Sequence, residues 1–203
     1  MTLSHTTQHG RSVTRASITA PPDVMAGSGS ATQIVTLRNG RSVALRTAHA
    51  RDIPAVQEFV RGLSSTSRRN RFFAPIRELS PDQLERVTRS CPPAEVALVC
   101  ETVEDAGRRI VAMAQYATCE ELDAEFAIVV DDTWQRQSLG IQLLGVLADY
   151  ATQAGLTELT GLVLRDNWPM LALLARFECE LITDGDPYVI RAIKRLHAHK
   201  LAA

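Results

Sequence analysis

The chain has 203 residues, 45% of them hydrophobic, which is enough to bury the core of one ordinary domain. Its formal net charge of -1 provides no general attraction to nucleic acid or to an anionic membrane, so we expect neither as a partner. An anionic ligand therefore has to be held by local groups.

Residues 1–30 are rich in Ser, Thr, Gly and Pro without apolar periodicity, which predicts a disordered N-terminal tail. An ordered domain is expected at 31–196, with a C-terminal tail at 197–203. Because the chain has neither the compact apolar stretch of a secretory signal nor the roughly 20 apolar residues that span a bilayer, we expect a cytoplasmic protein. The four cysteines lack Cys-x-x-Cys spacing and are expected to be free thiols, and the scattered histidines predict no metal site.

The N-terminal half of this domain predicts a hairpin followed by three helices. Two short extended runs at 33–46 flank an Asn-Gly pair, which is typical of a tight hairpin turn. Apolar residues at helical spacing predict a first helix over 53–63, with Asp52 as its cap, and a second helix follows over 64–73. At 80–90 a Ser-Pro-Asp start, with a cap residue and a proline at the first helical position, predicts the third helix.

The second half begins with strands. Apolar runs rich in β-branched residues predict strands at 96–100, 109–116 and 124–130, arranged as an antiparallel meander. A helix then begins at Leu139 and keeps its apolar residues on one face as far as Ala154. The remaining predicted elements are a strand at 160–164, a helix at 167–176, a short strand at 180–183 and a last strand at 188–193.

Chemically informative residues gather where the strand at 124–130 runs into a polar loop that opens the helix at Leu139. The unsatisfied backbone amides of a helix N-terminus form an anion site, and each dipole contact is worth about 0.3 to 2 kcal/mol. Ser138 and Gly140 are small enough for backbone and phosphate to approach closely, and Arg136 adds a positive charge. The same residues would also suit a plain strand-to-helix connection, so this motif alone leaves both interpretations open.

Four short motifs together resemble a known family. Residues 135–140, Gln-Arg-Gln-Ser-Leu-Gly, resemble the GNAT acyltransferase signature Gln/Arg-x-x-Gly-x-Gly/Ala, and residues 167–171, Asn-Trp-Pro-Met-Leu, resemble the second cofactor motif of that superfamily. Arg-Phe-Phe at 71–73 and Ala-Glu-Phe-Ala at 124–127 look like the catalytic domain of Pat-type bacterial protein lysine acetyltransferases. The resemblance covers about residues 40–194.

The resemblance implies an α/β fold of the α+β kind, in which helices flank a mixed, mostly antiparallel sheet. The sheet would be splayed between its fourth and fifth core strands, here 124–130 and 160–164, so that the pantetheine arm of acetyl-CoA lies in the opening like an added strand. A backbone amide near Val130 would polarise the thioester carbonyl as negative charge develops on its oxygen. The residues implied to bind acetyl-CoA are Ile128, Val129, Val130, Gln135, Arg136, Gln137, Ser138, Leu139, Gly140, Ile141, Asn167 and Met170.

Glu125 matches the glutamate that serves as general base in the Pat-type group. Freeing a lysine amine from its proton at pH 7 costs about 4.6 kcal/mol, so some base has to help. Strand alternation puts the Glu125 side chain on the face of Ala127 and Val129, opposite the bulky residues Phe126 and Ile128. A solvated carboxylate on an exposed strand face is the alternative interpretation.

The acceptor implied by the resemblance is an amine, in the first place a protein lysine, with polyamines, amino acids and aminoglycosides as the alternative class. A non-catalytic acyl-CoA sensor is the rival from another class, because Ser138 replaces a usual Gly and Glu178-Cys179 replaces a usual Gly-Phe pair. Ser138 keeps its amide and adds a hydroxyl donor, whereas Glu178 brings an acid near a polyanionic ligand unless it faces water. The oligomeric state stays open, with a homodimer among the alternatives.

Overall fold

A computed structural model describes residues 32–103, 107–120, 122–183 and 185–196, and the expected tails at 1–30 and 197–203 lie outside the described residues. Eight strands form one sheet in the order β1-β2-β3-β4-β5-β6-β8-β7. The strands are β1 (Gln33–Thr36), β2 (Ser42–Thr47), β3 (Glu95–Thr102), β4 (Ile110–Thr118), β5 (Asp123–Val130), β6 (Glu158–Leu164), β7 (Glu180–Ile182) and β8 (Val189–Arg195). The helices are α1 (Ile53–Gly62), α2 (Ser65–Phe72), α3 (Pro81–Thr88), α4 (Leu139–Gln153) and α5 (Trp168–Arg176), with short 3-10 turns η1 (Ala50–Asp52) and η2 (Asp132–Trp134).

The predicted hairpin and meander are confirmed. Strand β1 pairs antiparallel with β2 across a turn in which Gly40 has a φ of 83°, a value that glycine adopts without strain. Strands β2, β3, β4 and β5 continue as antiparallel neighbours. The order of the last strands was not predicted: β8 lies between β6 and β7, so the final strand of the domain is internal to the sheet.

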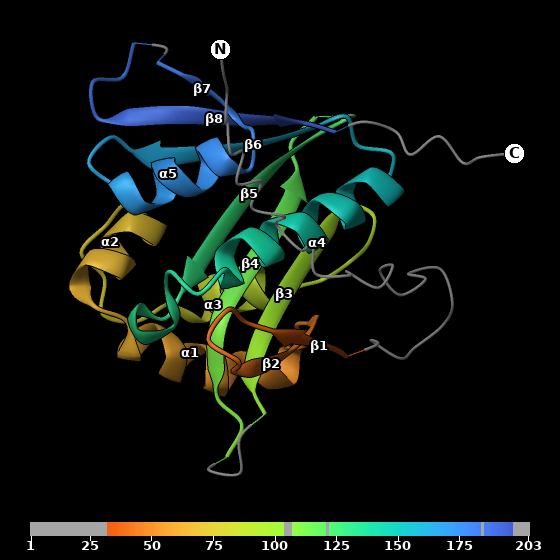
Figure 1. The fold of residues 1–203 in the computed structure, drawn as a ribbon, viewed down its shortest axis with the longest axis vertical. Coiled ribbons are helices and arrows are strands. Elements are labelled where there is room, and N and C mark those ends of the chain that lie inside the picture. The colour runs from red at the N-terminus through yellow and green to blue at the C-terminus, as the bar shows by residue number, and fades with distance from the viewer. Residues whose placement is uncertain (1–31, 104–106, 121, 184, 197–203) are drawn as a thin grey trace, which may run out of the picture.

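The predicted splay is confirmed between β5 and β6. These two strands run parallel and pair only over three positions, from Asp123 with Glu158 to Glu125 with Thr160. Beyond that point β5 stays paired with β4 and β6 stays paired with β8, so the two halves of the sheet diverge. Figure 1 shows β6, β7 and β8 crossing the top of the molecule while β3, β4 and β5 run steeply below them. We call the opening between 126–130 of β5 and 161–164 of β6 the slot.

Helices cover both faces of the sheet and bury two apolar cores. On one face, α4 packs against β3, β4 and β5, and its fully buried leucines, among them Leu143 and Leu147, form the larger core. On the opposite face, α1 and α3 cover β3 and β4 through a smaller core that includes Val56 and Phe59. In Figure 1 helix α4 lies in front of the sheet and α1 and α3 lie behind it. Strand β5 therefore contributes to both cores, and its alternate side chains point toward different helices.

Asp52 occupies the N-cap position of α1, as predicted, but the capping hydrogen bond expected of its side chain is not formed. Instead its carboxylate accepts hydrogen bonds from Arg46 at 2.7 and 2.8 Å and from the backbone N–H of His49 at 2.8 Å. Burial acts to raise the pKa of Asp52, but the hydrogen bonds from Arg46 and from the His49 backbone, together with the charge of Arg46, outweigh it and lower the pKa overall. Arg46, on strand β2, takes the carboxylate that would otherwise cap the helix. Residue spacing near Asp52 does not reveal this contact.

Two further features bear on the sequence expectations. No helix in the described part of the chain reaches the length and apolarity needed to cross a bilayer. The four cysteines are free thiols, as predicted. Burial raises the pKa of Cys100 and also that of Cys179, the latter to about 11, although the charge of Lys194 opposes the rise. Both thiols therefore stay protonated and unreactive near neutral pH.

Candidate functional site

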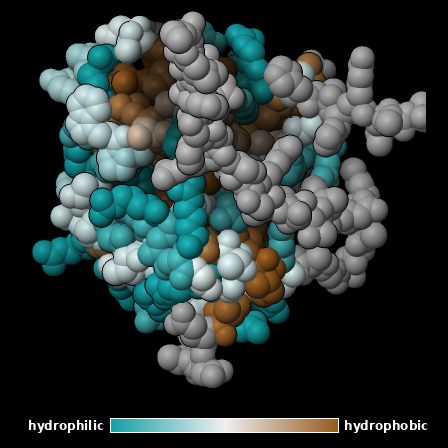
Figure 2. Space-filling model, viewed as in Figure 1, coloured by the Kyte–Doolittle hydropathy of each residue, from teal (hydrophilic) through white to brown (hydrophobic). Residues whose placement is uncertain are grey.

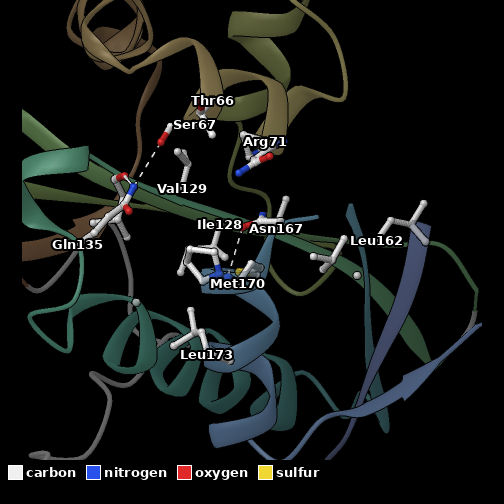
Figure 3. A pocket seen from close by; sticks show the side chains of 18 of the residues that line it. Thr66, Ser67, Arg71, Ile128, Val129, Gln135, Leu162, Asn167, Met170 and Leu173 are labelled. Atoms are coloured by element: carbon white, nitrogen blue, oxygen red, sulfur yellow. Dashed lines mark hydrogen bonds between the residues drawn. The ribbon is translucent and has the colours of Figure 1, made fainter. Parts of the chain in front are cut away.

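A cavity of about 890 Å³ opens at the slot. Strand β5 lies at its centre, and the wall divides into two parts (Figure 3). One part, here the α4/α5 half, consists of the start of α4, α5 and the loop that joins β6 to α5. The other part, the α2 half, is formed by residues 66–67 and 69–73, from α2 and its C-terminal end. Figure 2 shows apolar residues gathered in a hollow in the upper part of the molecule, in the region where Figure 1 places α5 and β6 to β8.

Most of the site residues predicted from the sequence line this one cavity. They are Glu125, Ile128, Val129, Val130, Gln135, Arg136, Ser138, Gly140, Ile141, Asn167 and Met170. Two do not. The Gln137 side chain accepts a hydrogen bond from Asn39 at 2.6 Å and donates one to the Thr133 carbonyl at 3.1 Å, while Leu139 is buried in the α4 core with 1% exposure. Their side chains stabilise the loop rather than face the cavity.

Within the described residues, the strands that flank the slot present peptide groups to it that pair with no neighbouring strand, although the Val130 carbonyl already accepts a hydrogen bond from Gln135 at 3.1 Å. The backbone N–H of Asp131 donates to the Val111 carbonyl of β4, so the alternation of a strand turns the peptide groups of Val129 toward β4 as well. Ile128 and Val130 then face the slot. On the other side, Arg165 N–H bonds to the Tyr188 carbonyl beside β8, which by the same alternation leaves Leu162 facing the slot. An extended ligand can therefore add to the edge of β5 as a strand does.

The connection from β5 to α4 has the backbone of an anion site. Arg136 and Ser138 have positive φ values of 59° and 75°, and left-handed residues in a loop are typical of backbone concavities in which successive amides bind an anion. Helix α4 begins directly afterwards and carries no acid in its first turn. Its N-terminal dipole is therefore free to favour a negative charge.

Two glycines allow close approach around the cavity. A Cβ at Gly140 would lie 3.0 Å from Leu173, so the bare helix start lets α5 pack against α4. A Cβ at Gly161 would lie 2.8 Å from the Phe126 ring, which is itself buried. Because that ring lies against β6 at the end where the strands still pair, it closes the narrow end of the slot. Sequence reasoning gave Gly140 a phosphate-related role and gave Gly161 none.

A carboxylate fixes α2 against the β5–α4 connection. Asp132 accepts hydrogen bonds from the Ser64 backbone N–H at 2.9 Å, the Ser64 hydroxyl at 2.8 Å and the Ser67 hydroxyl at 2.7 Å. Burial acts to raise the pKa of Asp132, but these bonds from Ser64 and Ser67 outweigh it and lower the pKa overall. Gln135 extends the contact, because its amide donates to Ser67 at 3.3 Å and to the Val130 carbonyl at 3.1 Å, as Figure 3 shows for Ser67. The α2 half is thereby held beside the slot.

Glu125 and Arg71 supply the charges at the α2 side of β5. Glu125 is exposed and lines the cavity near the last paired position of β5 and β6. Arg71 points from α2 into the cavity above Ile128 (Figure 3). Burial among the cavity walls lowers the pKa of Arg71 to about 10, and the charge of Glu125 acts against this fall. The sequence motif drew attention to Arg71, but nothing in it showed that the side chain would face Glu125.

The two departures from the family pattern have different consequences. Ser138 lines the cavity, but its hydroxyl is buried without a hydrogen-bond partner among the described residues. Glu178 has a φ of 58° and occupies the left-handed position after α5, where Cys179 N–H bonds to the Leu174 carbonyl. Its side chain is 87% exposed, lies 3.7 Å from Lys194 and does not line the cavity. Glu178 therefore faces water, and it does not oppose an anion in the cavity.

Comparison with known proteins gives consistent results. The model of the family described as "Acetyltransferase (GNAT) family" matches residues 65–178. Acetyltransferase PA5475 of Pseudomonas aeruginosa is 30% identical over 127 residues, which make up 62% of this chain and 68% of that protein. The GNAT domain of S. lividans PAT has a TM-score of 0.75 at 24% identity, covering 81% of this chain and 97% of that one. The cAMP-binding acyltransferase from Mycobacterium smegmatis has a TM-score of 0.58 at 19% identity, covering 83% of this chain but only 48% of that one, so this chain spans about half its length.

Proposed function

Because this chain belongs to the GNAT acetyltransferase family and is an N-acyltransferase, moving an acyl group from acyl-CoA to an amine, we propose that its donor is acetyl-CoA and its general base is Glu125. The observation that carries the proposal is the limited pairing of β5 with β6, which leaves peptide groups facing a cavity that contains a carboxylate. The residues present fit such a donor, since the slot offers strand-like hydrogen bonding and the α4 start offers amides without a competing acid.

In this proposal the α4/α5 half holds the donor. The Val130 N–H and the Ile128 carbonyl bind the pantetheine amides, because Gln135 already occupies the Val130 carbonyl. The backbone from Arg136 to Gly140 binds the pyrophosphate. Val129 contributes its side chain only. Asn167, whose side chain accepts a hydrogen bond from Met170 N–H at 3.3 Å, caps α5 and so fixes the wall beside the pantetheine.

A short acyl group fits the narrow end of the slot. The pyrophosphate at the start of α4 directs the arm along β5 toward Glu125, where the Phe126 ring against Gly161 blocks further extension. This supports acetyl as the transferred group in preference to a long acyl chain.

The chemical step is direct attack of the amine on the thioester carbonyl. Glu125 takes a proton from the amine, the carbon–sulfur bond breaks and the departing sulfur leaves as a thiol after gaining a proton. A peptide N–H stabilises the charge that develops on the carbonyl oxygen. Ile128 is the better candidate for this contact than Val130, because three strand residues from Glu125 span about 10 Å and five span roughly 16 Å. The shorter separation is preferred because the Glu125 carboxylate and the N–H donor have to act on the same amine and carbonyl group.

Two acceptor classes suit this chemistry. A protein lysine is the acceptor that the Pat-type resemblance implies. A small amine is the second candidate, and a specific observation favours it, namely the Arg71 guanidinium in the α2 half beside Glu125.

The experiment measures thiol release from acetyl-CoA with a panel of amines and lysine peptides. Glu125→Gln should lower kcat about 100- to 10,000-fold while leaving the dissociation constant of acetyl-CoA unchanged. Glu120→Gln, in the exposed turn before β5, is the matched control and should keep full activity. Binding of acetyl-CoA without any acceptor-dependent thiol would identify an acyl-CoA sensor and reject the proposed transfer.

A further inference from the structure

Helix α2 carries three arginines, and only two of them are engaged by the protein. Arg68 donates to the carbonyls of Ile76 at 3.0 Å, of Arg61 at 3.1 Å and of Leu63. Arg69 pairs with Asp166 at 3.0 Å across the mouth of the cavity. For Arg71, by contrast, the described residues provide no hydrogen bond and no ion pair, only the Phe72 ring with its centroid 5.0 Å away. Arg71 lines the cavity, and its guanidinium, which carries five donors, has no hydrogen-bond partner among those residues.

The surrounding charges leave Arg71 and Glu125 as an open pair. The other acids that line the cavity are already engaged, Asp132 by Ser64 and Ser67 and Asp166 by Arg69. Glu125 acts on Arg71 electrostatically, yet no ion pair within 4.0 Å joins them. The Arg71 guanidinium and the Glu125 carboxylate therefore both line the cavity without contacting each other. Arg71 is half-buried and keeps its proton near neutral pH, so it favours a ligand that brings a negative charge.

We propose that Arg71 binds a carboxylate of the acceptor, and that the acceptor is a small zwitterionic amine, a free amino acid. This inference rests on the proposed function, because it assigns Glu125 to the amine. An amino acid complements the open pair, with its ammonium group toward Glu125 and its carboxylate toward Arg71. The guanidinium fork matches a carboxylate in two parallel hydrogen bonds. A lysine side chain inside a protein brings only a positive charge to this point, which Arg71 repels.

The place of Arg71 argues against a role in holding the donor phosphates. The anion site at the start of α4 follows Val130, whereas Arg71 lies above Ile128 (Figure 3), the residue whose N–H is assigned to the thioester carbonyl, and is acted on by the charge of Glu125. Arg71 also belongs to the α2 half of the cavity, and Ser138 and Gly140 belong to the α4/α5 half. The guanidinium is thus near the reacting end.

The test compares free amino acids with their own α-carboxamides as acceptors, with acetyl-CoA as donor. Each pair has the same side chain and amine and differs in the negative charge. For the wild-type protein, kcat/KM for the acid should exceed that for the amide by roughly 10- to 100-fold, the range of a charge-assisted hydrogen bond. Arg71→Gln should remove this preference and leave the KM for acetyl-CoA unchanged, and Arg71→Lys should restore part of it. Arg77→Gln, on the exposed connection after α2, serves as the control and should behave as wild type.

A binding measurement keeps this test separate from the proposed function. Calorimetry with N-acetyl amino acids and with their amides reports carboxylate binding even where no thiol is released. Wild type should bind the acids more tightly than the amides, and Arg71→Gln should bind both equally. Equal binding or turnover of acid and amide by wild type would overturn the inference while leaving acetyl transfer intact. So would an Arg71→Gln variant that raises only the KM for acetyl-CoA, or lysine peptides that outcompete every amino acid independently of Arg71.

Discussion

Ser138 combines two unfavourable features at the residue that opens α4. Its backbone has a φ of 75°, which a non-glycine residue adopts at a cost of about 1 kcal/mol or more. Its hydroxyl is buried and has no hydrogen-bond partner among the described residues, and an unsatisfied buried hydroxyl costs about 1–3 kcal/mol. The glycine of the family signature would avoid both.

Ser138→Gly should therefore raise the free energy of unfolding by about 1 kcal/mol, after the larger entropy of an unfolded glycine offsets part of the gain. Urea denaturation of the free protein measures the change. Ser138→Ala is the matched variant, because it removes the hydroxyl but keeps the strained backbone, and it should gain less. Loss of stability in both variants would mean that the hydroxyl has a partner after all. Affinity for acetyl-CoA should persist in both, since the amide remains.

Single residues also mark the limit of sequence reasoning. Glu125 was predicted as the base because a motif identified it, and strand alternation then predicted the face on which it lies. Asp52 was placed correctly at the start of α1, but its side chain does not bond to the helix, because Arg46 approaches from a strand and engages the carboxylate. The sequence also could not show that Arg71, and not Arg68 or Arg69, lacks a partner among the described residues. This difference arises because Asp166 and several backbone carbonyls engage the two other arginines of α2.

At the scale of elements, α2 is held by the carboxylate of Asp132. The folded protein lowers the pKa of Asp132, with burial opposing the shift and the bonds from Ser64 and Ser67 producing it. A carboxyl group with a lowered pKa stabilises the fold fully above its ordinary pKa, and this contribution is lost as the pH falls through the lowered value. The attachment of α2 is therefore sensitive to acid.

Asp132→Asn should reduce the free energy of unfolding at pH 7 by about 1–2 kcal/mol, discounted for the partial exposure of the side chain. The difference from wild type should shrink as the pH falls below about 4, the ordinary range of an aspartate. Urea titrations of both proteins between neutral and acidic pH measure it. A difference that stays constant down to low pH would show that the charge of Asp132 has no part in holding α2.

The elements themselves were largely predictable because their signals are local. Apolar spacing, the Asn-Gly turn and the Ser-Pro start of α3 predicted every helix and strand to within a few residues. The insertion of β8 between β6 and β7 was not predicted, because it depends on which edge of the sheet remains available after β6 has formed. Local sequence patterns do not show which of β7 and β8 pairs with β6.

For the whole molecule, the consequence of the splay is that two halves of one sheet share few hydrogen bonds. The strands from β1 to β5 form one paired unit and β6, β8 and β7 form another, joined through three β5–β6 positions and through packing with α4 and α5. The family resemblance predicted the splay. It did not predict which peptide groups face the opening. In a strand, alternate residues direct their peptide groups to opposite sides, and the pairing of Asp131 with β4 decides which residues face the slot.

The alternating orientation of the β5 peptide groups predicts an alternating pattern of amide hydrogen exchange. In the free protein the amides of Ile128 and Val130 should exchange faster than that of Val129, because they face the slot and Val129 faces β4. Saturating acetyl-CoA should slow exchange at Ile128 and Val130 and leave Val129 nearly unchanged, since a ligand added to the β5 edge reaches only the outward-facing groups. Residue-resolved exchange by NMR measures this, with Met113 in β4, the partner of Val129, as an internal reference. Uniform protection along β5 would instead indicate general stiffening of the sheet, and binding of the pantetheine as an added strand would then be rejected.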